Sequence, residues 1–78
     1  MPDPSTTAET DLALRSLRGA IAALPRDYRE VLVLREFEGL PYRAIADIIE
    51  APIGTVMSRL SRARDLLAQT VRDAGELK

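Results

Sequence analysis

The sequence predicts an all-α domain of four helices, and three observations support this. Apolar residues recur at intervals of three and four along most of the chain, which is the spacing of one helix face. Proline or glycine separates these segments, and none of them alternates strictly between apolar and polar residues as a half-buried strand does. With 78 residues, 46% hydrophobic and 29% charged, the chain has the length and composition of one small globular domain.

The first helix is expected to follow a flexible tail or linker over residues 1–7. Thr6 and Glu9 are spaced as in a capping box, in which a hydroxyl and a carboxylate bond the free amides of a helix start. Pro25 marks the end of this helix, because the residue before a proline is pushed out of helical geometry. The buried stripe consists of apolar residues at helical spacing: Leu14, Leu17, Ile21 and Leu24.

A second helix is expected from about Pro25 to Glu38, with Gly39 as the residue that ends it. Its centre, Val31 to Leu34, is apolar on most sides, which is typical of a helix surrounded by others. The third helix begins at Pro41 and ends near Glu50. Its buried face is predicted to be Ile45, Ile48 and Ile49.

A fourth helix is expected to begin at Gly54 or Thr55 and to run to about Arg72, where Asp73 to Gly75 would end it. At about 100° per residue, one side of this helix is apolar and forms a core face. The core face consists of Val56, Leu60, Ala63 and Leu67. The opposite, solvent face consists of Met57, Ser58, Ser61 and Arg62, with Thr55 and Arg59 on its flank. The folded domain therefore spans residues 8–72, and residues 73–78 are predicted to be a C-terminal tail.

A short helix, a turn of about four residues and a second helix form the helix-turn-helix pattern, here in the third and fourth helices. In that geometry the second helix enters the major groove of DNA with its first residues at the base edges. Arginine can pair with guanine, serine can donate or accept, and methionine can contact a thymine methyl group.

The charge distribution supports this reading although the net charge is only −1. Residues 1–50 carry six arginines and nine acids, a net charge of −3, whereas residues 51–78 carry five cations and three acids, a net charge of +2. Between Ala51 and Arg64 there are three arginines and no acid. The positive charge is thus concentrated where the fourth helix begins.

Several classes of function are excluded by what the sequence lacks. Cysteine and histidine are both absent, which excludes disulfides, zinc fingers and histidine-based triads, so no metal and no cofactor is expected. No nucleophile–base pair and no glycine-rich phosphate loop is present, and we therefore expect a protein that is not an enzyme. No apolar run reaches about 18 residues and no signal peptide precedes the domain, which predicts a cytoplasmic protein without a membrane partner.

Three runs in this order resemble region 4 of bacterial RNA polymerase sigma factors, and most of all the extracytoplasmic-function group. They are LPRDYREVL from Leu24, EGLPYRAIA from Glu38 and GTVMSRLSRAR from Gly54. The resemblance implies that the domain binds the −35 promoter element in double-stranded DNA and docks on the β flap of RNA polymerase. It also implies masking by an anti-sigma factor.

By position in these runs, the residues that would face bases are Met57, Ser58, Ser61 and Arg62. Those expected near the DNA backbone are Arg35, Tyr42, Arg43, Thr55, Arg59 and Arg64. The candidate surface for polymerase or an anti-sigma factor is Leu14, Leu17, Ile21 and Leu32.

The sequence departs from the family pattern at three positions. Met57 stands where the family often has lysine or arginine, Pro41 where it often has serine, and Glu50 where it often has glycine. At Met57 the resemblance implies that a base or phosphate contact of the family is lost or changed, and Glu50 predicts either a strained backbone or a different turn.

Two alternatives stay open on the sequence alone. One is a helix-turn-helix domain kept mainly for interaction with proteins, which the acidic first half and Met57 would suit. The other is an output domain of the LuxR type, which shares part of the third-helix pattern but typically has a different last helix.

Overall fold

A computed structural model describes residues 15–76 of the chain, and within this range it contains helices and no strand. Residues 15–22 are helical and are followed by α2 (Arg26–Glu36), α3 (Tyr42–Ile49) and α4 (Ile53–Glu76). The predicted all-α class with four helices is confirmed. The predicted tail over residues 1–7, the Thr6–Glu9 capping box and Leu14 lie outside the described residues.

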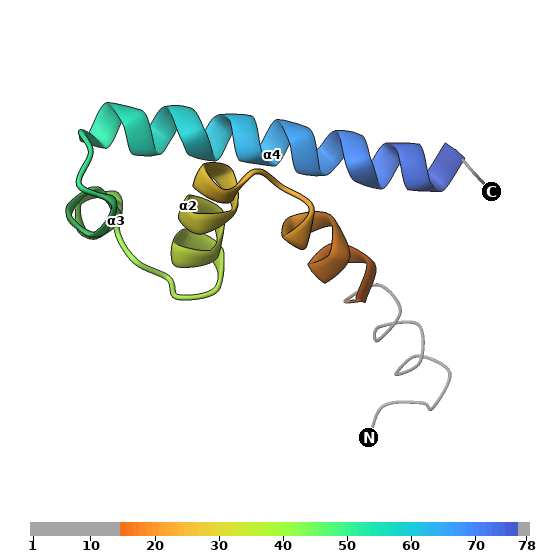
Figure 1. Ribbon diagram of the computed structural model, residues 1–78, viewed down its shortest axis with the longest axis horizontal. Coiled ribbons are helices and arrows are strands. Elements are labelled where there is room, and N and C mark those ends of the chain that lie inside the picture. The colour runs from red at the N-terminus through yellow and green to blue at the C-terminus, as the bar shows by residue number, and fades with distance from the viewer. Residues whose placement is uncertain (1–14, 77–78) are drawn as a thin grey trace, which may run out of the picture.

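The long helix α4 organises the fold, as Figure 1 shows. Both α2 and α3 lie along its first half, and the helix at 15–22 lies on the same side under its second half (Figure 1). The molecule measures only 14 Å along its shortest axis. Helix α3, seen nearly end-on in this view, runs along that axis and is itself about 12 Å long, so the fold is thin and much of each helix stays exposed (Figure 1).

The core lies where α2, α3 and α4 meet. Val31, Ile45, Val56 and Leu60 are at most 1% exposed, and each of the three helices contributes at least one of them. The predicted core face of α4 is confirmed, because Ala63 is also fully buried and Leu67 is packed against this cluster. The prediction for α3 is wrong at Ile48, which is 55% exposed. This helix has only eight residues and is buried through Ile45 and Ala46, and among the described residues no helix covers the side that carries Ile48.

Proline precedes each of the last three helices. Pro25 and Pro41 are the N-cap residues of α2 and α3, so each of these helices begins one residue later than the sequence predicts. Pro52 directly precedes α4. The carbonyl groups of these prolines accept the first helical hydrogen bonds, for example from the amide of Arg29 at 2.9 Å and from that of Ile45 at 3.1 Å. Because the fixed φ angle of proline already suits a helix start, these positions fix where each helix begins.

The turn between α3 and α4 contains Glu50 in the left-handed region, with φ 56° and ψ 50°. The amides of Glu50 and Ala51 both donate to the carbonyl of Ala46, an arrangement of the Schellman type. Of the two alternatives predicted for Glu50, a strained backbone or a different turn, the structure therefore shows the strained backbone. Gly39 has φ +68° after α2, although this helix ends at Glu36, two residues before the predicted end.

Helix α4 is longer than the sequence predicts. It begins at Ile53 and continues to Glu76, so residues 73–76 are helical rather than part of a tail. A single glycine costs a helix only about 1 kcal/mol and leaves its backbone hydrogen bonds possible, so Gly75 does not end it. Among the described helices, none is long and apolar enough to cross a membrane.

Candidate nucleic-acid interface

The first three turns of α4 present a polar face opposite the core. Ser58, Ser61 and Arg62 are exposed, as is Met57 at 52%, while Val56, Leu60 and Ala63 on the other side are buried. Thr55 and Arg59 are half-buried on the flank. The division of the helix into two faces thus follows the angular prediction. That the exposed four contact bases stays a prediction.

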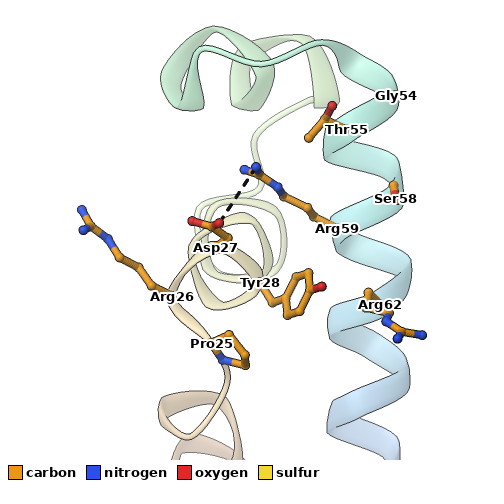
Figure 2. Close-up of a pocket in the computed structure, with 9 residues that line it drawn as sticks. All are labelled: Pro25, Arg26, Asp27, Tyr28, Gly54, Thr55, Ser58, Arg59 and Arg62. Atoms are coloured by element: carbon orange, nitrogen blue, oxygen red, sulfur yellow. Dashed lines mark ion pairs between the residues drawn. The ribbon is translucent and has the colours of Figure 1, made fainter.

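One flank of this face forms a groove with the start of α2. Figure 2 shows the residues that line it, which come from two segments far apart in the sequence. The lining residues are Pro25, Arg26, Asp27, Tyr28, Gly54, Thr55, Ser58, Arg59 and Arg62. Three arginines and one aspartate give the groove a net charge of +2. Such a groove is suited to an anionic backbone.

The groove contains one ion pair. The guanidinium of Arg59 reaches from α4 toward Asp27 in α2, with 4.0 Å between Nη2 and Oδ2 (Figure 2). The side chain of Asp27 is 71% exposed, so water screens this pair and it contributes little to stability. A phosphate that entered the groove would compete with this carboxylate for Arg59.

The start of α4 also offers backbone donors to the groove. The first backbone hydrogen bonds of α4 come from the amides of Thr55 and Val56, which donate to the carbonyl of Pro52 at 3.0 and 3.3 Å. The amides of Ile53 and Gly54 precede this first turn and have no helical acceptor. A glycine at position 54, which lines the groove, lets an anion approach closely because it has no Cβ.

Arg35 and Tyr42, both predicted near the DNA backbone, contact each other in the structure. Arg35 donates from Nη1 to the carbonyl oxygen of Leu40 at 2.9 Å, and its guanidinium lies 4.8 Å from the centre of the Tyr42 ring. These contacts connect the end of α2 to the start of α3. The guanidinium of Arg35 therefore holds the loop between the two helices, a role that sequence reasoning missed.

Arg64 is also engaged within the fold. It donates a 2.7 Å hydrogen bond to Oε1 of Glu36, which joins α4 to the end of α2. This hydrogen bond raises the pKa of Arg64 above its ordinary value. Arg43 lies exposed in the first turn of α3. Of the six residues predicted near the backbone, only Thr55 and Arg59 line the groove.

The predicted surface for a protein partner requires correction. Ile21 and Leu32 are 7% and 2% exposed, because they pack into the core cluster, so a partner cannot reach them in this fold. Leu17 is half-buried against the same cluster, and Leu14 lies outside the described residues.

A different apolar surface lies on the outer side of α2. Phe37 is 58% exposed at the end of this helix, and Val33 and Leu34 line a shallow groove beside Arg26 and Arg29. The signal in the sequence was the spacing of Val33 and Phe37, which places them on one side of a helix. We define Val33, Leu34 and Phe37 as the outer α2 surface.

Comparisons with known proteins agree with this architecture. Residues 14–67 match the family described as Sigma-70, region 4. The chain is 48% identical over 52 residues to the RNA polymerase sigma-H factor of Pseudomonas aeruginosa, which covers 67% of this chain and 27% of that protein. It is 45% identical over 49 residues to the ECF RNA polymerase sigma-E factor of Haemophilus influenzae, covering 63% and 26%. Its identity to the sigma-E factor of Escherichia coli K12 is 46% over 52 residues, covering 67% and 27%. The chain thus spans about a quarter of the length of these curated relatives.

Proposed function

Because the chain belongs to the sigma-70 region 4 family, in its extracytoplasmic-function group, we propose that it binds the −35 element of promoter DNA through α4. Its place in the relatives is that of one module of an RNA polymerase sigma factor, which directs polymerase to a promoter. The role is one of binding, and no chemical step is part of it. It would be carried out in the cytoplasm, where bacterial promoters and polymerase are found.

One observation carries the proposal: the exposed start of α4 combines serine and arginine with no acid, and adjoins a groove of net positive charge. Ser58, Ser61 and Arg62 are exposed on this face, and Arg59 lines the groove. A solvated helix surface ordinarily mixes charges of both signs. A helix about 10–12 Å wide also fits the major groove of B-DNA, which is about 12 Å wide.

The roles of the side chains follow from their positions. Arg62 is suited to bidentate pairing with guanine, and Ser58 and Ser61 can donate to or accept from base edges. Thr55, Arg59 and the first amides of α4 would hold a phosphate in the groove. Arg43 would add charge from α3, while Arg35, Tyr42 and Arg64 would support this surface through the contacts they make within the fold.

We also propose that polymerase is bound on the outer α2 surface, where Phe37 is 58% exposed. None of its three residues lines the groove beside α4, so α4 could occupy DNA at the same time. The partner expected there is the β flap, and an anti-sigma factor that covered either surface would block the domain. Binding to polymerase would also raise the effective concentration of this small domain at its promoter, because we expect its own affinity for DNA to be weak.

The experiment is a set of three arginine substitutions on α4, each tested by fluorescence anisotropy with duplexes selected from a random pool by the 78-residue chain. Arg62→Ala should weaken binding to the selected duplex by about 1–3 kcal/mol and relax the base preference at one position. Arg59→Ala should weaken binding to selected and unrelated duplexes equally, and the affinity of this variant should depend less steeply on salt concentration.

Arg72→Ala is the matched control, because this arginine is exposed on the same helix beyond the groove. If Arg62→Ala and Arg59→Ala bind as the control does, the proposed DNA function is refuted. The remaining alternative is then a helix-turn-helix domain kept for protein interaction, tested by a pull-down of the β flap with wild type and Phe37→Asp. The LuxR-type alternative has no support from the family match.

A further inference from the structure

The exposed face of α4 has an apolar border. Ile53 is 39% exposed and Met57 is 52% exposed. They are four residues apart, so they are neighbours on successive turns of the same side of the helix. Both precede Ser61 on the same side of the helix. A single exposed apolar residue is common on protein surfaces. Here two of them, Ile53 and Met57, lie next to each other along one side of the face that carries Ser58, Ser61 and Arg62.

This border and the arginine side of the face lie apart around the helix. Met57 and Arg62 are separated by about 140° around the axis, with Ser58 and Ser61 between them. Arg62 and Ser58 line the positively charged groove, whereas Met57 and Ile53 do not. One side of the face therefore offers donors and charge, and the other offers a flexible apolar side chain.

The chemistry of DNA has one counterpart for such a side chain. In the major groove every base edge presents hydrogen-bond donors or acceptors, and the 5-methyl group of thymine is the apolar feature that a side chain can contact. Met57 cannot donate a hydrogen bond and has three rotatable bonds, so it can adapt its thioether to a methyl group.

We propose that Met57 is a specificity-determining residue that reads the methyl group of a thymine in the promoter element, with Ile53 packed behind it. This inference rests on the proposed DNA function and adds a base identity to it. Met57 and Arg62 are five residues apart, about 7.5 Å along the helix. Because they also differ by about 140° around its axis, the thymine belongs to a different base pair of the same element from the guanine that Arg62 reads.

The test replaces thymine by deoxyuridine, which removes the methyl group and leaves every hydrogen-bonding atom in place. A duplex selected by the 78-residue chain is labelled, each thymine is replaced in turn, and binding is measured by anisotropy with wild type, Met57→Ala and Val71→Ala. Val71→Ala is the matched control, because Val71 is an apolar residue of the same helix with 53% exposure, against 52% for Met57. Circular dichroism of each variant verifies that the fold is kept.

For wild type and Val71→Ala, one thymine of the selected site should respond, with binding about fourfold weaker for deoxyuridine, the effect of burying one methyl group. Met57→Ala should bind the two duplexes equally. A selected site with no responsive thymine, or a response that persists in Met57→Ala, would overturn the inference. Selective binding that depends on Arg62 but ignores the methyl group refutes this inference alone. Absence of any selective binding refutes both it and the proposed function.

Discussion

Replacement of Gly54 by alanine is predicted to stabilise the fold and at the same time to weaken DNA binding. Gly54 is the second residue of α4, and a Cβ built on it meets no atom within 4 Å. Alanine is the better helix former by about 1 kcal/mol within a helix and by somewhat less in a first turn. The free energy of unfolding should therefore increase by about 0.5–1 kcal/mol.

The effect on DNA has the opposite sign. Gly54 lines the groove, and its free amide is one of those proposed to donate to a phosphate. A methyl group at this point keeps the phosphate from approaching to hydrogen-bond distance. A hydrogen bond to a charged group contributes about 1.5–3 kcal/mol, so the Kd should increase at least about tenfold.

Gly19→Ala is the matched control for both measurements. Gly19 is also helical and exposed, its Cβ would also meet nothing within 4 Å, and it does not line the groove. Urea denaturation followed by circular dichroism should show that both variants are stabilised. Anisotropy with a labelled duplex should show weaker binding for Gly54→Ala alone. Equal DNA affinities for the two variants would refute the reasoning that a phosphate lies against the start of α4.

Three further predictions concern the turn, the groove and the loop. Glu50→Gly should raise the free energy of unfolding by about 0.5–1 kcal/mol in urea, because relief of the left-handed backbone outweighs the entropy that glycine gains on unfolding; a lower denaturation midpoint would contradict this. Asp27→Asn should strengthen binding to selected and unrelated duplexes alike, by several-fold at low salt and hardly at high salt, since it removes the acid that competes for Arg59; an unchanged Kd at low salt would speak against a phosphate in the groove. Arg35→Met should lower the free energy of unfolding by about 1–3 kcal/mol through loss of the bond to Leu40 and of the contact with Tyr42, with DNA affinity of the folded protein kept; the reverse pattern would return Arg35 to the DNA backbone.

The helix order and the two faces of α4 could be predicted because they depend on local features. Proline before each of the last three helices fixes where they begin, to within two residues. The burial of Val56, Leu60 and Ala63 follows from helical periodicity, since any partner helix must cover the apolar side. The family could be identified because its motif residues stand in these same segments.

The assignments that required knowledge of neighbouring helices were the ones that failed. Ile21, Leu32 and Ile48 are equally apolar in sequence, yet the first two are buried and the third is 55% exposed. Periodicity identifies an apolar side of a helix but does not tell which part of it another helix will cover. For the same reason the sequence did not distinguish Arg35 and Arg64, which connect helices within the fold, from Arg59, which lines the groove.

The amino-acid sequence by itself determined four helices, a last helix that begins with serines and arginines and has no acid up to Arg64, and the resemblance to a sigma region 4 domain. These properties depend on residues close together in the chain, whose spacing sets local geometry and charge. Only the tertiary structure decided that the start of α2 completes a positive groove beside α4, that Asp27 lies in it, and that Phe37 is exposed at the end of α2. Residues 25–28 and 54–62 meet there because the shared core of Val31, Val56 and Leu60 holds α2 against α4, and such a contact depends on packing over distances that no local pattern specifies.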